Sequence, residues 1–157
     1  EEFYELGIDA VIAEARRVIA LDPNDADGYA GLGVILTWAG KPKETIGLVR
    51  RAMRLNPRYP PTYLWGLGHA QAMTGDFEKS IDSFKRLIAI NPDFMPAYAY
   101  LAFMYTELDR MEEARREMAE VERISPAVTP HDMKKRLPYK DGAILDRVIS
   151  AMSKTMK

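Results

Sequence analysis

A short phrase, in which Leu or Ile and one polar residue precede a proline, recurs along this chain at almost constant spacing. The prolines are Pro23, Pro57, Pro92 and Pro126, and successive copies lie 34, 35 and 34 residues apart. A fixed period of this length predicts a repeat architecture, in which each unit buries its apolar face by stacking on its neighbours. The extra residue of the middle interval falls within residues 58–61, where we expect a loop that tolerates an insertion.

Composition limits the classes of function that we expect. The chain has 22 basic and 23 acidic residues, so its net charge of −1 provides no long-range field to attract nucleic acid. It has no cysteine, which excludes disulfides and fits a reducing, cytoplasmic location. No apolar run approaches the ~20 residues that a membrane-spanning helix needs. Because the chain begins without Met or a signal-peptide pattern, we expect it to be a fragment of a longer protein.

Turn and capping residues divide each unit into two helices. Gly40 and Gly75 end the first helix of the first two units, and Asp109 lies in the corresponding turn of the third. Asp25 or Asp27 can cap the first of these helices. We expect helices over about residues 26–39, 42–55, 61–74, 77–90, 95–108 and 111–124.

The two ends of the chain depart from this period. Upstream, residues 8–21 predict one helix equivalent to the second helix of a unit, with its partner missing or reduced to residues 3–6. Downstream, Thr129 and the residues after it predict a helix start, followed by a short basic helix over residues 133–136. A last amphipathic helix is expected over residues 143–153.

An amphipathic helix that follows a solenoid usually covers its last apolar face. We therefore expect the final helix to pack on residues 111–124. The apolar residues that should make this contact are Ile144, Leu145, Val148 and Ile149.

The units resemble the tetratricopeptide repeat, a helix-turn-helix motif of about 34 residues. The residues that match its pattern are Tyr29, Leu32, Gly33, Gly40, Ala52 and Pro57 in the first unit, Leu64, Leu67, Gly68, Gly75, Phe77, Phe84 and Pro92 in the second, and Tyr98, Leu101, Ala102, Tyr105, Ala114 and Pro126 in the third. The resemblance covers about residues 8–126. Thr45 and Ser80 replace a small alanine of the pattern, and we expect them to loosen local packing.

This resemblance implies an all-α, right-handed superhelix, an α-solenoid of about three helix pairs. The expected division is a partial repeat at 1–25, three units at 26–126 and a capping segment at 127–157. Proteins of this family are helical scaffolds that bind other proteins, so the resemblance implies a protein or peptide partner.

Two segments are also similar to the repeat regions at the C-termini of some bacterial class III adenylate or guanylate cyclases. They are residues 52–65 and the tail that begins at residues 136–141. In that family the repeats follow a catalytic domain and serve as an interaction or regulatory module. No part of a cyclase catalytic domain occurs here, so the resemblance implies a parent protein and gives this chain no activity.

The helical glycines require an explanation, because glycine inside a helix costs about 1 kcal/mol relative to alanine. Gly28, Gly31 and Gly33 do not have the spacing of a dinucleotide-binding loop, and no strand precedes them. We expect Gly33 and Gly68 to allow the two helices of a unit to approach each other closely.

No constellation of residues predicts catalysis, a cofactor or a metal site. His69 and His131 are the only histidines, and a metal would need further ligands beside them. For His69 a contact with a partner and a structural role stay open, while His131 is expected to be solvated. The basic run of residues 134–136 is expected to be a solvated helix face, with contact to an acidic partner or lipid headgroup as the alternative.

The inner face of the first helix of each unit lines a concave groove in this family. Matching the units predicts an apolar and aromatic groove, and exposed apolar surface of this kind usually marks an interaction site. The candidate partner-binding residues are Ala30, Val34, Trp38, Trp65, His69, Met73, Phe103 and Glu107. Because both Trp residues should face the groove, we expect their truncation to affect binding more than folding.

The sequence therefore predicts a protein–protein interaction module that binds a partner peptide or helix in this groove and belongs to a larger protein. Two alternatives stay open. In one, the chain's own tail fills the groove and the module is autoregulatory. In the other, two copies stack through the open N-terminal helix and form a homodimer.

Overall fold

The computed structural model describes residues 2–136 and 142–156. This part of the chain forms helices and no strand, which confirms the expected all-α class. The described helices are α1 (Glu2–Leu21), α2 (Ala26–Trp38), α3 (Pro42–Leu55), α4 (Thr62–Met73), α5 (Phe77–Ile90), α6 (Met95–Glu107), α7 (Met111–Ile124), α8 (Pro130–Arg136) and α9 (Gly142–Thr155).

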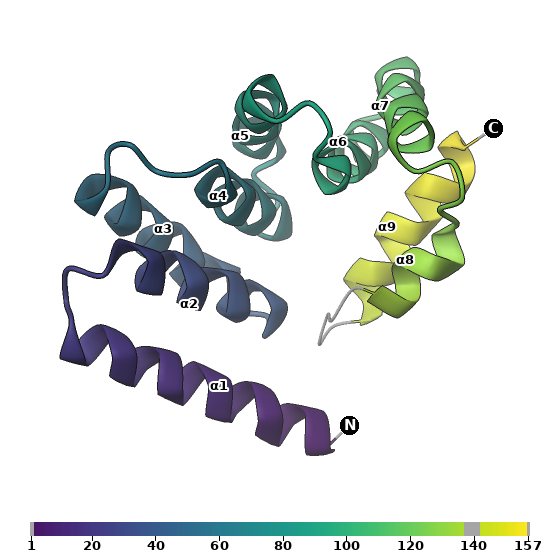
Figure 1. Ribbon diagram of the computed structural model, residues 1–157. Helices are drawn as coiled ribbons and strands as arrows, with labels where there is room; N and C mark the ends of the chain where they lie inside the picture. The colour runs from purple at the N-terminus through teal and green to yellow at the C-terminus, as the bar shows by residue number, and fades with distance from the viewer. Residues whose placement is uncertain (1, 137–141, 157) are drawn as a thin grey trace.

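Six of these helices form three hairpins, α2–α3, α4–α5 and α6–α7, whose two helices pack on each other. Neighbouring hairpins join through contacts of α3 with α4 and of α5 with α6, and α4 also contacts both α2 and α6. Figure 1 shows the hairpins following one another along an arc, with α1 at one end and α8 and α9 at the other. This stacking is the expected solenoid.

The same turn closes each hairpin. Gly40 and Gly75 both have φ 81°, and Asp109 has φ 58°. The N–H of the residue that follows each of them donates to the carbonyl five positions earlier, at 2.8–3.0 Å. Such a left-handed residue ends a helix, and aspartate tolerates this conformation better than most other non-glycine residues. At the start of α2, Asp25 is the capping residue, because its carboxylate accepts from the Gly28 N–H at 3.0 Å.

Gly33 and Gly68 lie where the two helices of a hairpin approach each other most closely. A Cβ atom on Gly68 would lie 2.8 Å from the Phe84 ring, and one on Gly33 would lie 3.1 Å from the side chains of Thr45 and Val49. The expected reason for these helical glycines is therefore confirmed. Both residues match the position at which the repeat pattern has glycine.

In each of the first two hairpins, a side-chain hydroxyl of the second helix bonds to a backbone carbonyl of the first helix. Thr45 and Ser80 donate to the carbonyls of Gly33 and Gly68, both at 2.6 Å, and both side chains are buried. The expectation that these residues loosen packing is wrong, because each hydroxyl forms a bond between helices that contributes about 1 kcal/mol. Ala114 occupies the matching position in the third hairpin and has no hydroxyl to donate.

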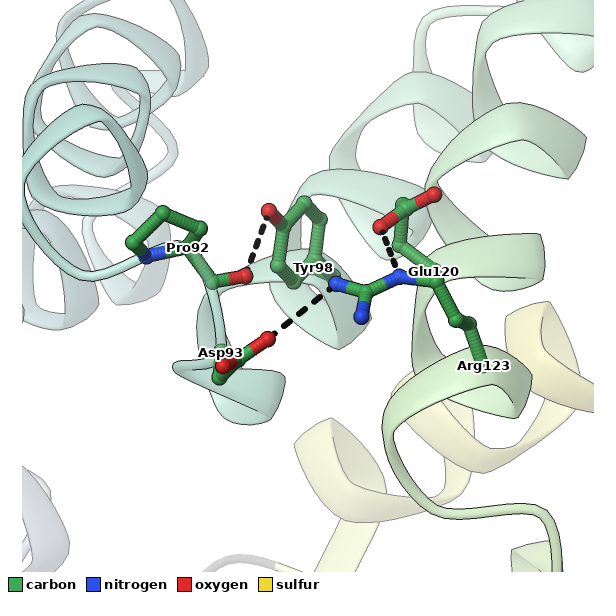
Figure 2. A network of polar contacts seen from close by, with 5 residues as sticks. All are labelled: Pro92, Asp93, Tyr98, Glu120 and Arg123. Carbon is green, nitrogen blue, oxygen red and sulfur yellow. Dashed lines mark hydrogen bonds and ion pairs between the residues drawn. The ribbon is translucent and has the colours of Figure 1, made fainter.

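The third hairpin is instead fixed to the loop before it by polar contacts (Figure 2). The Tyr98 hydroxyl donates to the Pro92 carbonyl at 2.9 Å. Arg123 of α7 bridges Asp93 at 3.3 Å and Glu120 at 2.7 Å. Burial of Tyr98, together with the nearby Glu120 carboxylate, raises the pKa of its hydroxyl. These contacts are structural, and the exposed ion pairs are each worth about 0–1 kcal/mol.

Helix α1 is longer than the sequence predicted. Residues 3–6 continue the same helix rather than forming a remnant of a partner helix, which corrects that expectation. Its buried side packs on α2 through Ile12 and the half-buried Ile19. The side next to this contact exposes Val11 (50%), Val18 (44%) and Leu21 (85%), so this end of the solenoid keeps an uncovered apolar row in the described structure.

The other end of the solenoid is covered. Helix α9 packs on α6, α7 and α8, so it contacts the expected helix α7 and, in addition, the inner helix α6. Leu145, Val148 and Met152 are buried, and the half-buried Ile149 packs against the apolar cluster that contains Met152, Met118 and Val121. The side chain of Ile144 and residues 137–141 lie outside the described part. The division of the chain into segments 1–25, 26–126 and 127–157 stays a prediction.

Candidate functional site

The eight candidate groove residues lie on the inner helices α2, α4 and α6, but their exposure differs. Val34, Trp38, Trp65 and Met73 are half-buried, Ala30, His69 and Phe103 are buried, and Glu107 is exposed. The continuous exposed apolar surface that we expected is therefore present only in part. The partner-binding role of these residues stays a prediction.

An aromatic cluster closes the middle of the inner face. The His69 ring lies 4.6 Å from Trp38 and 5.1 Å from Trp65, where the distances join ring centroids. Tyr100 of α6 meets both residues, with centroid distances of 5.2 Å to His69 and 5.5 Å to Trp65. Trp65 also packs on Phe84 of its own hairpin at 5.7 Å. The large side chains of three successive inner helices thus fill the space between them, and we call these four residues, Trp38, Trp65, His69 and Tyr100, the aromatic cluster.

His69 is fully enclosed in this cluster. Its exposed fraction is 0%, and its Nε2 lies 3.4 Å from the Tyr100 hydroxyl. Burial lowers the pKa of His69 to about 3 and raises the pKa of Tyr100 well above its ordinary value. The imidazole is therefore neutral at physiological pH, and of the roles that the sequence left open the structural one agrees with this geometry.

The inner face is open at the N-terminal ends of α2 and α4. Here a depression of about 370 Å³ lies between the two helices. Its lining residues are Asp27, Ala30, Gly31, Val34, Val49, Pro60, Thr62, Tyr63 and Gly66. The Tyr63 hydroxyl donates to Asp27 Oδ1. Burial, with the neighbouring Asp27 carboxylate, raises the pKa of Tyr63 to about 12, so this hydroxyl stays protonated and holds the carboxylate in place.

A second set of depressions follows the C-terminal ends of the inner helices. One of about 470 Å³ lies between the α2–α3 turn and Met73, and one of about 260 Å³ lies between Met73, Phe103 and Arg147. A third, of about 290 Å³, adjoins Glu107 and α9. Arg147 lies 5.7 Å from the Phe103 ring centroid and pairs with Glu107. The tail therefore covers part of the inner face of α6.

Sequence reasoning missed the depression at Asp27. Tyr63 and Asp27 are 36 positions apart, so no local pattern links them. Gly31 gave no distinctive signal, because Gly47 on α3 is also an exposed helical glycine one turn after an acid and lies outside the depression. A Cβ atom on Gly31 would meet nothing within 4 Å.

The described residues offer few other kinds of site. Within residues 2–136 and 142–156, no group of three or more His, Cys, Asp or Glu side chains is placed to hold a metal ion. None of the helices described is long and apolar enough to cross a membrane. Lys134, from the basic run noted in the sequence, pairs with Asp146 of α9 at 3.0 Å, so part of that run holds the tail together.

Comparison with known proteins gives one family match. Residues 61–94, which contain α4 and α5, match the model of the tetratricopeptide repeat. No curated protein sequence matches the chain significantly.

Among solved structures, the chain is similar to MamA, with 22% identity and a TM-score of 0.69 over 95% of this chain and 86% of that one. It is similar to PilW, a type IV pilus biogenesis factor, with 19% identity and a TM-score of 0.69 over 90% of this chain and 64% of that one. A thermophilic TPR protein of Thermus thermophilus shares 22% identity, with a TM-score of 0.65 over 95% of this chain and 75% of that one. At these identities the likeness establishes the fold.

Proposed function

We propose that this chain, a helical repeat protein of the tetratricopeptide type, is a non-catalytic module that binds a peptide or helix of a partner protein along the inner faces of α2, α4 and α6. The repeat type supports a protein partner in general. The observation that carries the proposal is the pair of open regions at the two ends of the aromatic cluster. Ala30 and Val34 line one of them, and Met73 and Phe103 line the other.

These regions suit an extended or helical segment better than a compact ligand. Apolar residues line both of them beside one charged residue, Asp27 in one and Arg147 in the other, and they lie on helices of different hairpins. An apolar side chain placed in such a depression leaves water and gains about 25 cal/mol for each Å² of apolar surface that it buries. The aromatic cluster between the two regions supplies a rigid wall, because its side chains are already packed against each other.

The experiment is selection of binding peptides from a phage-displayed library of random dodecapeptides, followed by titration of the selected peptides against the purified chain. Tryptophan fluorescence is a suitable readout, because Trp38 and Trp65 lie between the two depressions. We expect micromolar binding that is weakened about tenfold or more by Val34→Glu or by Met73→Glu, since each places a charge in an apolar contact. The control is Ile90→Glu on α5, where Ile90 is 62% exposed.

Peptides that bind equally well to all three variants would show that the interaction surface lies elsewhere. Failure to select any binding peptide under conditions that succeed for an unrelated peptide-binding domain would also count against the proposal.

Self-association is the second candidate, and the uncovered row on α1 favours it. Val11, Val18 and Leu21 are three exposed large apolar residues on one helix, and apolar rows of this kind pack against another helix. Sedimentation equilibrium of the chain and of a Val11→Lys, Val18→Lys double variant separates the two candidates. A concentration-dependent dimer that the double variant abolishes supports this candidate, whereas a monomer at all concentrations rejects it.

The resemblance to cyclase repeat regions supports a place within a larger, cytoplasmic regulatory protein. The contact of α9 with α6 supports the related proposal of an autoregulatory tail, because Arg147 already occupies part of the inner face of α6. Sequencing the complete gene tests the first proposal. Removal of α9 tests the second proposal. If the tail competes with the partner, its removal should strengthen peptide binding, whereas an unchanged affinity would show that α9 is only a cap.

A further inference from the structure

The depression between α2 and α4 contains a carboxylate, that of Asp27, and no cationic side chain among the described residues that line it. Asp27 is exposed at the surface of this depression. The other described residues of its lining are uncharged, and none is lysine, arginine or histidine.

The carboxylate of Asp27 is held in a fixed position. The Tyr63 hydroxyl donates to Oδ1, and the Tyr63 ring is 3% exposed and stacks on Tyr59 with centroids 5.8 Å apart. No hydrogen bond from the described part of the chain reaches its second oxygen, Oδ2, so this oxygen can accept from a ligand. A group that is already oriented binds with a smaller loss of conformational freedom than a mobile surface side chain.

The walls of the depression have room for an alkyl chain. Ala30, Val34 and Gly66 form an apolar surface, and Gly31 lies among them with open space where its Cβ atom would be. Glycine destabilises a helix relative to alanine. Close packing explains the glycines at positions 33 and 68. At Gly31, as at Gly47 on α3, a Cβ atom would meet nothing within 4 Å, and at Gly31 this open space lies in the depression.

We propose that this depression receives the side chain of a lysine or arginine from the partner segment, with the alkyl stem on Ala30 and Val34 and the cationic group at Asp27. The proposal rests on the proposed function and adds the charge of the residue that the partner must supply. It also gives the module a means to reject partners, because an acidic side chain at this place meets Asp27 and loses its hydration without a compensating donor.

The first experiment uses a probe that needs no knowledge of the partner. The chain, labelled with ¹⁵N, is titrated to millimolar concentrations with N-acetyl-arginine N-methylamide and with the corresponding lysine derivative, and amide shifts are followed by NMR. We expect saturable shifts confined to residues 27–34 and 62–66. N-acetyl-citrulline N-methylamide, which has nearly the same shape as the arginine probe and no charge, is expected to bind about tenfold more weakly.

Two variants test the carboxylate and the open space separately. Asp27→Asn keeps an acceptor for Tyr63 and removes the charge, and we expect it to weaken binding of the cationic probes about tenfold. Gly31→Leu fills the depression and is compatible with the helix, so we expect it to abolish the shifts while the chain stays folded. Matched controls are Asp9→Asn, an exposed acid on α1, and Gly47→Leu, where a Cβ atom on α3 also meets nothing within 4 Å.

Equal binding of the citrulline and arginine probes, or shifts that both Asp27→Asn and Gly31→Leu leave unchanged, would overturn the inference. A further experiment distinguishes failure of this inference from failure of the proposed function. Each lysine or arginine of the phage-selected peptides is replaced with norleucine, which keeps an alkyl side chain and removes the charge. Peptides that keep their affinity and still respond to Met73→Glu refute the cation site and leave the proposed function standing. Absence of any peptide binding refutes the proposed function.

Discussion

The inner face of this solenoid contains two neighbouring regions built from the same helices in opposite ways. In the middle, Trp38, Trp65 and Tyr100 surround His69 and leave its side chain no exposed surface. At the N-terminal ends of α2 and α4, small residues leave a depression of about 370 Å³ beside Asp27.

The difference shows that the repeat pattern fixes where a groove lies but does not fix whether it is open. Bulky residues at inner positions of adjacent units reach one another and become core. Small residues at the same helical faces leave space for a ligand. The closed region should therefore control stability, whereas the open region should tolerate substitution. The following predictions test this contrast.

The largest effect is expected for Trp65→Ala. The sequence alone suggested that this truncation would leave folding intact, but Trp65 packs on Phe84, Phe94 and Tyr100. Removing a packed aromatic ring from this cluster should cost about 3 kcal/mol, a fall in Tm of roughly 6–12 °C. Thermal unfolding followed by circular dichroism measures it, with Trp65→Phe as the control that keeps a ring. An unchanged Tm for the alanine variant would show that the middle of the face is open as well.

The next effect depends on pH. Burial lowers the pKa of His69 to about 3 from 6.5, so between these values the unfolded chain binds a proton that the folded chain does not bind. Stability must therefore fall as pH drops through about 6.5 and must level off below about 3. Between pH 7 and pH 5, His69 alone should lower the free energy of unfolding by about 2 kcal/mol.

Urea unfolding of the parent and of His69→Leu at the two pH values measures this contribution. On acidification, the free energy of unfolding of His69→Leu should fall by about 2 kcal/mol less than that of the parent. The control His131→Leu, at an exposed position, should behave like the parent. Identical losses in the parent and His69→Leu would mean that the imidazole is not enclosed.

Gly68→Ala should destabilise the chain by about 1–2 kcal/mol. Its new Cβ atom would lie 2.8 Å from the Phe84 ring, and the buried ring must shift to make room. The gain in helix propensity offsets only part of this cost. Chemical unfolding provides the measurement, and a stabilised variant would contradict the close approach of α4 and α5.

The smallest effect has the opposite sign. Gly31→Ala places a methyl group where nothing lies within 4 Å. We therefore expect the free energy of unfolding to rise by about 0.5–1 kcal/mol from helix propensity alone. Gly47→Ala on α3 should gain about as much and serves as the matched case outside the depression. A loss of stability at Gly31 would show that the depression is smaller than described.

Local signals predicted most of the fold. Pro23, Pro57 and Pro92 set the register, and Gly40 and Gly75 ended helices within a residue or two of their observed ends. One error came from contacts that no local pattern contains, because Thr45 and Ser80 bond to carbonyls 12 positions away. The other concerns residues 3–6, which belong to α1 because the helix continues through Gly7, although glycine is a weak helix former.

The candidate site was predicted less completely than the fold. Assignment of inner positions unit by unit gave the correct helix faces, but it treated each side chain as if its neighbours were small. His69 meets Trp38 only because α2 and α4 pack side by side. The exposure of a groove residue depends on the sizes of residues about 34 positions away, and this dependence is a property of the stacked units rather than of any one of them.

The hydroxyl bonds inside the first two hairpins have a mechanical consequence. Thr45 and Ser80 stiffen the first two hairpins from within, so we expect bending between these hairpins to occur at their boundary, where α3 and α2 meet α4. The depression at Asp27 spans this boundary, with lining residues from both hairpins. We therefore expect its width to change when the curvature of the solenoid changes. A segment that wedges between α2 and α4 would alter the curvature, and any force that straightens or bends the solenoid would in turn alter the grip on that segment.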